Sequence, residues 1–486
     1  MATIGERLKA LREEAGYSQT RIARLAGTNQ PSIGRYENGN TAAPLKTLLW
    51  YADYFDVSLD YIFGRTADPA GTRYRTGRAA DGEGGKSGRG ATGGPPVLVR
   101  DILLESAEAH PDLTAYFVKD ARTEPYRPIT YREAMNDIVA LGARLVDLGL
   151  SGKRIAVIGD NCYGWATAYF AALFGAGVVV PLDKELRGEE IAYLLEYGKC
   201  DAVFYTERYD DLMDGIDSVP YKIRMTQYLG ASSPVGIWTW QRLLDEGKAL
   251  PRKKLDAFRR TPIDPDAMAA LLFTSGTTGN AKGVMLSNRG MGTNISDMAA
   301  AHSVKPGGTT VSILPMHHCF EAVMGQQFML ANGVAIAFGD GLKYIQKNME
   351  EVRPTVMLFV PLLLENFYNK ILRGVAESGR ETDLQKRIND YLNLRASLGP
   401  DDDSKAREAA RKIFKEEQKV FGGRLDSVFT GAAAINPRVV RGLQELGLKI
   451  TYGYGMTECG PLMTTTPYFS DTMAKSGSVG PSVASG

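Results

Sequence analysis

The chain has 486 residues, and its content of 44% hydrophobic, 9% aromatic and 23% charged residues is that of an ordinary globular protein. A chain of this length predicts about three domains with sizeable hydrophobic cores. The net charge of +1 provides no general attraction for a polyanion. Any contact with nucleic acid therefore has to come from a local surface.

The cysteines and the apolar stretches indicate the cellular compartment in which the protein is expected. The four cysteines are scattered, with no pair at metal-ligand spacing, which favours the reducing cytoplasm over a disulfide scaffold. The N-terminus is a charged amphipathic segment rather than a signal peptide. The longest apolar stretch, Trp165 to Leu182, is interrupted by two glycines and a proline. We therefore expect a buried helix and strand there, and no transmembrane segment.

The first 65 residues have the pattern of a small helical bundle. Apolar residues from Ile4 to Leu11 form one stripe of a helix that Gly16 ends, and Ser18 opens a second helix. A third short helix is expected from about Gln30 to Glu37, and two more follow to close the core. Short helices joined by a turn that contains glycine are the helix-turn-helix arrangement.

Three segments in this region, Gly16-Tyr-Ser-Gln19, Ala26-Gly-Thr-Asn-Gln-Pro-Ser-Ile33 and Tyr36-Glu-Asn-Gly39, resemble the phage-repressor (Cro-like) helix-turn-helix family. The resemblance implies binding of double-stranded DNA through residues 1–65, with the start of the third helix in the major groove. Asn and Gln pair with adenine and Arg pairs with guanine. Base contacts are therefore expected from Asn29, Gln30 and Arg35, and phosphate contacts from Gln19, Ser32 and Asn38.

Two features of this region leave an alternative open. Residues 1–65 carry 8 Lys and Arg against 7 Asp and Glu, a surplus of only one positive charge. A monomer with so little charge should bind DNA weakly, and members of the family usually bind as dimers, which implies a homodimer. The alternative is a helical bundle used for contacts with other proteins.

Residues 66–97 change character abruptly. Gly, Ser, Arg, Ala and Asp dominate, and no apolar period is present, which predicts a flexible linker. From residue 98 onward, predicted strands alternate with predicted helices, which indicates βαβ units and a mostly parallel sheet. The predicted organisation is therefore a helix-turn-helix domain at 1–65, a linker at 66–97 and an α/β domain at 98–486.

The central motif of the large domain runs from Leu271 to Gly283. An apolar run, Met268 to Phe273, predicts a buried strand that leads into a loop of hydroxyls and glycines, and Lys282 follows the loop. Glycines let backbone N–H groups converge on an anion, and hydroxyls and a lysine add donors and charge. The sequence therefore predicts a phosphate-binding loop, although Ala281 stands where a Walker A motif requires glycine.

The run Thr274-Ser-Gly-Thr-Thr-Gly-Asn-Ala-Lys-Gly283 resembles the signature loop of the adenylate-forming enzymes, which include acyl-CoA synthetases. The resemblance implies the α/β fold of that family, with mostly parallel sheets packed by helices. It also implies contacts of the loop with the β- and γ-phosphates of ATP. The implied nucleotide-binding residues are Thr274, Ser275, Gly276, Thr277, Thr278, Gly279 and Lys282.

Further segments resemble the same family. In Tyr452-Gly-Tyr-Gly-Met-Thr-Glu458, the resemblance implies that Tyr454 stacks on adenine, Thr457 bonds the α-phosphate or the carboxylate, and Glu458 coordinates Mg²⁺. Thr430-Gly-Ala-Ala-Ala-Ile435 matches a turn of small residues that lets adenine approach the backbone. This turn implies adenine contacts at Gly431, Ala432 and Ala433.

The segment from Val311 to Glu321 is predicted as a strand that runs into a loop. It resembles the family segment beside the carboxylate substrate, and this places His318 on the motif histidine and Glu321 on the motif acid. The segment from Val352 to Ile371 and the charged helical insertion from about Leu384 to Gln418 resemble the long-chain fatty acyl branch.

These resemblances imply activation of a long-chain fatty acid by ATP through an acyl-adenylate, followed by transfer to coenzyme A. The segment Gly477 to Pro481 matches the point where relatives enter a third subdomain. We therefore expect the C-terminal lid and its lysine to be absent, with slow adenylation and slower thioester formation. Three interpretations stay open: a ligase that is a fragment or half of a split enzyme, a transcription regulator whose ligase-like domain senses its ligands, and an enzyme tethered or regulated by the DNA-binding domain.

Overall fold

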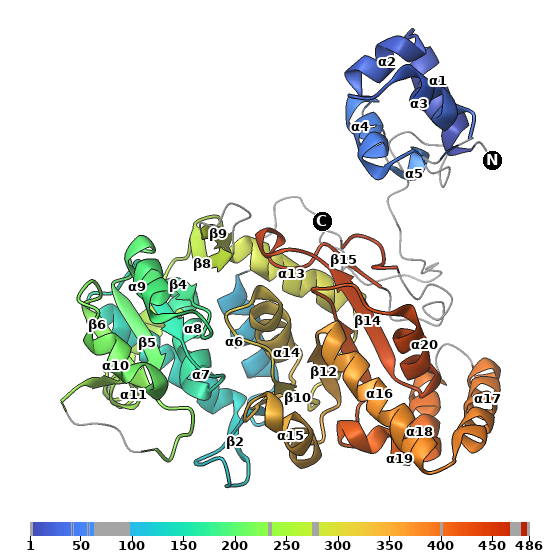
Figure 1. Ribbon diagram of the computed structural model, residues 1–486. Helices are drawn as coiled ribbons and strands as arrows, with labels where there is room; N and C mark the ends of the chain where they lie inside the picture. The colour runs from blue at the N-terminus through green and yellow to red at the C-terminus, as the bar shows by residue number, and fades with distance from the viewer. Residues whose placement is uncertain are drawn as a thin grey trace, which may run out of the picture. The chain divides into compact units, whose positions relative to one another are not determined.

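The computed structural model describes residues 3–39, 41, 43–55, 57, 59–62, 98–231, 236–274, 281–398, 402–466 and 478–483. Internal contacts divide the chain into two units, Met1–Thr92 and Gly93–Gly486. The predicted linker at 66–97 lies outside the described residues. Figure 1 shows both units.

The N-terminal unit is a helical bundle. Its core side chains Ile22, Ile33, Tyr51 and Ile62 are fully buried. The expected third helix has the bounds that the sequence predicted, and Ser18 caps the second helix as expected. The helices are α1 Ile4–Glu14, α2 Gln19–Leu25, α3 Gln30–Glu37, α4 Leu45–Phe55 and α5 Leu59–Ile62.

The described residues of the large unit form three sheets built mainly from parallel strands, which confirms the predicted α/β class. The strand orders are β7-β6-β5-β3-β4-β8-β9, β10-β11-β1-β2 and β12-β13-β14-β15. Antiparallel pairing occurs only at one edge of each sheet among the described strands, in the pairs β8–β9, β1–β2 and β14–β15. The strands are β1 Thr114–Val118, β2 Arg127–Thr130, β3 Lys153–Ile158, β4 Gly177–Pro181, β5 Ala202–Thr206, β6 Tyr221–Met225, β7 Trp238–Thr239, β8 Met268–Thr274, β9 Lys282–Ser287, β10 Thr309–Ser312, β11 Ala335–Phe338, β12 Val356–Phe359, β13 Ser427–Thr430, β14 Lys449–Tyr454 and β15 Thr464–Thr465.

Helices cover these sheets. The sequence pattern Thr130-x-x-Glu133 predicts a capping box at the start of α7, and the structure has it. The Thr130 hydroxyl accepts from the Glu133 N–H, and the Glu133 carboxylate accepts from the Thr130 N–H. Figure 1 shows α16 and α20 near the labelled strands β12 and β14, with α17 to α19 in the same part of the unit. The α-helices are α6 Val99–Ala109, α7 Tyr131–Asp147, α8 Tyr163–Ala171, α9 Gly188–Tyr197, α10 Asp210–Asp214, α11 Trp240–Lys248, α12 Arg252–Arg259, α13 Asn288–Ala301, α14 Met329–Ala331, α15 Ile345–Val352, α16 Pro361–Glu377, α17 Glu381–Ser397, α18 Asp403–Ile413, α19 Lys415–Gln418 and α20 Pro437–Glu445.

The part of the large unit that the structure describes also contains two π-helices and several 3-10 turns. The helix predicted within Trp165–Leu182 begins at Tyr163 and passes into the π-helix η1, Ala172–Ala176. The second π-helix is η3, Phe320–Phe328, and the 3-10 turns are η2 Glu207–Tyr209, η4 Leu342–Tyr344, η6 Lys419–Phe421 and η7 Thr457–Cys459. Among the described residues, none of the helices combines the length and hydropathy that a membrane span requires.

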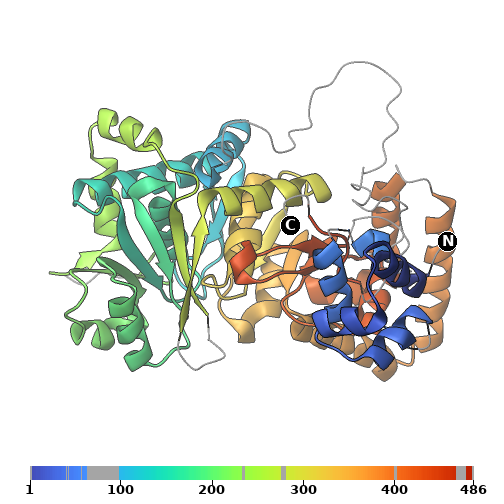
Figure 2. The ribbon, with the colours of Figure 1, turned by 90° about the horizontal axis from the view of Figure 1, so that it is seen from above.

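The main core lies between the seven-stranded sheet and the sheet that contains β1 and β11. It includes the fully buried aromatic side chains of Trp165, Phe170, Phe174 and Phe328. Helix α13 starts directly after β9 and contacts the π-helix η3. Seen from above, α13 (yellow) runs from β9 towards the red segment near the C-terminus (Figure 2). This helix therefore connects the phosphate-loop hairpin with the C-terminal motifs.

Candidate functional site

A cavity of about 300 Å³ lies where four segments of the large unit meet. These segments follow the strands β10, β12, β13 and β14. Its volume is at the lower end of the range for small-molecule sites. The lining residues are Leu314, Pro315, His318, Cys319, Phe320, Glu321, Val360, Gly431, Ala432, Gly453, Tyr454, Gly455, Met456, Thr457, Pro461 and Leu462.

Five residues that the sequence analysis singled out for catalysis or nucleotide binding line this cavity: His318, Gly431, Ala432, Tyr454 and Thr457. They come from three motifs that are far apart in the sequence. The structure brings these motifs together at the ends of parallel strands, where ligands bind in many α/β proteins.

The turn after β13 brings backbone close to the cavity. A Cβ atom on Gly431 would lie 2.9 Å from the carbonyl oxygen of Gly453 on the neighbouring strand, so only glycine fits there. Ala432 adopts a positive φ of 68°, a conformation that few residues with a side chain adopt. Ala433, predicted in the same turn, does not line the cavity, but its carbonyl oxygen accepts from the Tyr452 hydroxyl at 3.0 Å.

The segment after β14 folds back tightly into the turn η7. A Cβ on Gly455 would lie 1.7 Å from the carbonyl oxygen of Pro461, so the two arms of this loop approach to a distance that only glycine permits. Tyr454 is half exposed at the cavity. The Thr457 hydroxyl accepts from the Cys319 thiol at 3.5 Å.

Glu458 follows Thr457 and its side chain is exposed. Magnesium prefers one or two carboxylates together with phosphate oxygens and water. The exposed carboxylate of Glu458, next to the cavity residue Thr457, fits this preference. Within the described ranges no group of three or more His, Cys, Asp or Glu side chains could hold a metal ion.

The predicted phosphate loop closes the β8–β9 hairpin. Thr274 and Lys282 are paired at its end, and the Lys282 side chain is exposed. Ser275, Gly276, Thr277, Thr278 and Gly279 lie outside the described residues. Strand β9 contacts the turn η7, which carries Thr457 and Glu458.

The acid of the third motif is buried. Glu321 lies in the π-helix η3, which corrects the predicted loop, and π-helices often occur at functional sites. Its carboxylate accepts hydrogen bonds from Ser312 at 2.6 Å and from Gln326 at 3.3 Å. Burial raises the pKa of Glu321 to about 7, although the Ser312 and Gln326 hydrogen bonds oppose this shift.

Of the two adjacent histidines, His317 is partly buried and His318 is exposed at the cavity. Burial lowers the pKa of His317 to about 4, and His317 Nε2 lies 3.6 Å from the Asp183 carboxylate. Partial loss of solvent around the His318 ring also lowers the pKa of His318. Both imidazoles are therefore neutral near pH 7 and offer a hydrogen bond rather than a positive charge.

Several lining residues were not predicted as functional. Cys319 and Phe320 separate His318 from Glu321, and Pro461 and Leu462 return from the turn η7. For Cys319 the available signal was its position inside a recognised motif. For Leu462 there was none, because its place at the cavity depends on the fold of the loop.

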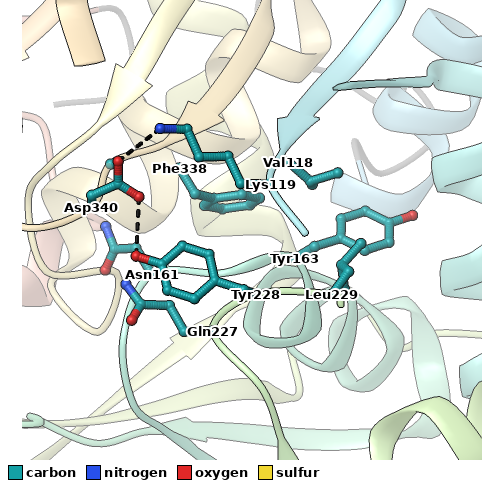
Figure 3. A pocket seen from close by; sticks show the side chains of 10 residues that line it. Val118, Lys119, Asn161, Tyr163, Gln227, Tyr228, Leu229, Phe338 and Asp340 are labelled. Carbon is teal, nitrogen blue, oxygen red and sulfur yellow. Dashed lines mark hydrogen bonds and ion pairs between the residues drawn. The ribbon is translucent and has the colours of Figure 1, made fainter. Parts of the chain in front are cut away.

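A second cavity, shown in Figure 3, has room for about one water molecule, with a volume of about 10 Å³. The buried ammonium of Lys119 donates to Asp340 at 2.9 Å and to Glu351 at 2.8 Å. The Tyr228 hydroxyl donates to the other oxygen of Asp340 at 3.1 Å. These side chains pair with one another, so the network connects strand ends rather than offering a ligand site.

The predicted DNA contacts lie on and around α3 of the N-terminal unit. The Gln30 amide donates to Gln19 at 2.7 Å, and Gln19 donates to the buried Glu37 at 2.9 Å. Glu37 is held in turn by Arg12, whose guanidinium donates to it at 2.8 Å. This chain of hydrogen bonds fixes the Gln30 side chain on the exposed start of α3.

The other predicted DNA contacts differ in exposure. Arg35 and Asn38 are exposed. The Asn29 side chain caps α3 by accepting from the Ser32 N–H at 3.0 Å. Ser32 itself is mostly buried and its hydroxyl accepts from Arg35 at 3.3 Å. Asn29 and Ser32 thus already have partners within the unit.

Residues 103–486 match the AMP-binding enzyme family, and this match spans most of the chain. The chain belongs to the AMP-binding enzyme family. Residues 8–62 match a helix-turn-helix family. Both matches agree with the resemblances that the sequence motifs indicated.

Curated relatives within the family are long-chain acyl-CoA synthetases. The peroxisomal long chain acyl-CoA synthetase 6 of Arabidopsis thaliana is 28% identical over 355 residues, which cover 70% of this chain and 49% of the relative. The long-chain-fatty-acid–CoA ligase 1 of Homo sapiens is 28% identical over 360 residues, which cover 69% and 50%. This chain therefore spans about half the length of these relatives.

A solved structure shares the fold. The long-chain-fatty-acid-CoA ligase FadD1 from Archaeoglobus fulgidus superimposes with a TM-score of 0.60 at 18% identity, over 82% of this chain and 71% of that one. The large unit therefore has the fold of this solved structure.

Proposed function

We propose that the large unit binds ATP and a long-chain fatty acid and joins them as an acyl-adenylate. The observation that carries this proposal is the convergence of His318, the Gly431–Ala432 turn and the Tyr454–Thr457 segment on one cavity. The long-chain class rests on the curated relatives, which are long-chain acyl-CoA synthetases.

In the proposed reaction a carboxylate oxygen of the fatty acid attacks the α-phosphorus of ATP, and pyrophosphate leaves. Such a step depends on positioning and charge neutralisation more than on proton transfer. Tyr454 would stack on adenine above the Gly431–Ala432 turn, and Thr457 would donate to the α-phosphate. Lys282 and the loop before it would hold the β- and γ-phosphates.

Glu458 would hold Mg²⁺ beside the phosphates, where the ion would supply positive charge. Coenzyme A is the proposed second substrate: its thiol would attack the acyl carbonyl carbon, and AMP would leave. The four cysteines of the chain are unpaired, which fits a reducing compartment and supports a cytoplasmic location.

Pyrophosphate exchange tests the adenylation step. Labelled pyrophosphate should enter ATP only when a fatty acid is present, and palmitate should support more exchange than acetate. Thr457→Val, which keeps the side-chain volume but removes the donor, should lower the exchange rate about tenfold or more. The matched control is Thr293→Val, because Thr293 donates only to its own helix at Arg289.

The exchange assay and calorimetric titration with ATP together distinguish an adenylating enzyme from a sensor. ATP binding by calorimetry without any fatty-acid-dependent exchange would support a different function, a transcription regulator that senses ATP, fatty acid or acyl-adenylate. Absence of both binding and exchange would contradict the site itself.

We also propose that the N-terminal unit binds double-stranded DNA as a homodimer with α3 in the major groove. The match to a helix-turn-helix family and the fixed, exposed Gln30 side chain support this proposal. Gln30 retains an amide oxygen and one N–H for a base edge, which is the pair that recognises adenine.

Gln30→Ala should weaken binding to an operator selected from random duplexes by about 1–3 kcal/mol and relax the preference at one base pair. Glu14→Gln, on the exposed end of α1, is the control and should keep the preference. Gel-shift titrations on the operator and on single-base variants measure both effects. An equal loss on every sequence would instead identify Gln30 as a phosphate contact.

A further inference from the structure

The loop after β14 contains Thr457 and Glu458, the proposed contacts with the ATP phosphate and with Mg²⁺. One side chain of α13, which does not line the cavity, makes hydrogen bonds to this loop. The Asn294 amide nitrogen donates to the carbonyl oxygen of Cys459 at 3.0 Å. Its amide oxygen accepts from the Leu462 N–H at 2.9 Å. Asn294 is only 5% exposed, so both bonds are shielded from water.

These two contacts lie on opposite arms of one loop. Cys459 is the last residue of the turn η7, which carries Thr457 and Glu458, and Leu462 is on the returning arm. Between them Gly460 packs against α13, since a Cβ there would lie within 4 Å of both Gly290 and Asn294. A single amide thus fixes both arms of the turn to the helix.

Helix α13 also begins at the phosphate-loop hairpin. Strand β9 starts at Lys282 and ends at Ser287, whose hydroxyl caps α13 by accepting from the Gly290 N–H. Asn294 is on the second turn of this helix. The chain from Lys282 to Asn294 is therefore one continuous strand and helix that ends in the contacts with the turn η7.

We infer that Asn294 is a positioning residue that sets the place of Thr457 and Glu458 relative to Lys282, and so assembles the Mg²⁺-dependent part of the nucleotide site. This inference rests on the proposed binding of ATP. Asn294 does not line the cavity and acts only through the backbone of the turn. Loss of its amide leaves a buried N–H and a buried carbonyl without partners, which favours a different conformation of the loop.

Two substitutions of Asn294 remove its hydrogen bonds to the loop to different extents. Asn294→Leu is close in volume and removes both hydrogen bonds. Asn294→Asp can still accept from the Leu462 N–H, but it cannot donate to Cys459, and it brings a negative charge to that carbonyl oxygen. Ser296→Ala is the matched control on the same helix, because the exposed Ser296 hydroxyl donates only to Gly292 of its own helix at 3.0 Å.

Calorimetric titration of the full chain with ATP, once with Mg²⁺ and once with EDTA, separates positioning from general packing. For Asn294→Leu we expect affinity about tenfold weaker with Mg²⁺ and changed less than about twofold in EDTA. Asn294→Asp should fall between Asn294→Leu and the unsubstituted chain, and Ser296→Ala should match the latter. Thermal unfolding of each variant is measured in parallel and shows whether that variant folds.

Three results would count against the inference. These are an unchanged Mg²⁺ dependence in Asn294→Leu, an equal loss of affinity with and without Mg²⁺, and an effect of Asn294→Asp no different from that of Ser296→Ala. If Asn294→Leu does not fold, the Asn294→Asp comparison decides. Failure of the unsubstituted chain to bind ATP would instead overturn the proposed function.

Discussion

Replacing Lys282 by alanine is expected to weaken binding of Mg-ATP by about tenfold or more. Lys282 is exposed at the end of the β8–β9 hairpin, so its ammonium is available to the phosphates. A unit charge about 4 Å from a phosphate near a protein surface contributes about 1–4 kcal/mol, and about 1.4 kcal/mol is a factor of ten in affinity. The loss should shrink as salt is raised, because salt screens exposed charges.

Glu458→Ala should show a different dependence in the same titrations. It should weaken binding in the presence of Mg²⁺ and leave binding in EDTA unchanged or slightly stronger, because the carboxylate repels the phosphates when no cation lies between them. Lys282→Ala should weaken binding in both conditions.

Two exposed residues serve as matched charge controls for this pair, Lys253→Ala on α12 and Glu377→Ala on α16. If Lys282→Ala binds Mg-ATP like Lys253→Ala, the loop is not the triphosphate site. If Glu458→Ala behaves like Glu377→Ala, the proposed Mg²⁺ ligand is wrong.

Local patterns predicted much of the fold. The bounds of α3, the capping box at Thr130 and the strand β8 depend on residues within a few positions of one another, and the structure has all three. The motif families also indicated the correct fold, because glycines such as Gly431 and Gly455 are required by backbone approaches that the fold imposes.

Features that depend on distant partners were not predictable. Glu321 lies in a π-helix rather than a loop, and no periodicity in that segment indicates the extra residue per turn. Asn294 has the sequence of an ordinary polar position on a helix. Its partners, Cys459 and Leu462, are more than 160 positions away in the chain. The burial and the hydrogen-bond partners of such side chains depend on the tertiary structure and not on the neighbouring sequence.

The buried carboxyl of Glu321 should make the free energy of unfolding depend on pH. Burial raises its pKa from the ordinary value of 4.5 to about 7, so the folded state binds the proton more tightly than the unfolded state. Below pH 4.5 both states carry the proton. Between pH 4.5 and 7 the folded state holds more protons, and the free energy of unfolding therefore falls as the pH rises. Above pH 7 both states are ionised and the loss is complete.

Glu321→Gln replaces the carboxyl with a neutral group of the same size that can still accept from Ser312. The variant should match the unsubstituted chain near pH 5, where Glu321 is mainly protonated in the folded state. Near pH 8 it should be more stable, and the relative gain between these pH values should be about 2–3 kcal/mol. Urea unfolding at both pH values measures the difference.

Glu105→Gln, on the exposed side of α6, is the control and should follow the unsubstituted chain. If Glu321→Gln loses stability with pH as steeply as that control, then Glu321 is not held neutral by its burial. A confirmed difference would carry a consequence for the site. Below pH 7 the carboxyl in the cavity wall is mainly protonated, so it adds less negative charge beside His318 and repels less strongly the carboxylate substrate that the cavity is proposed to bind.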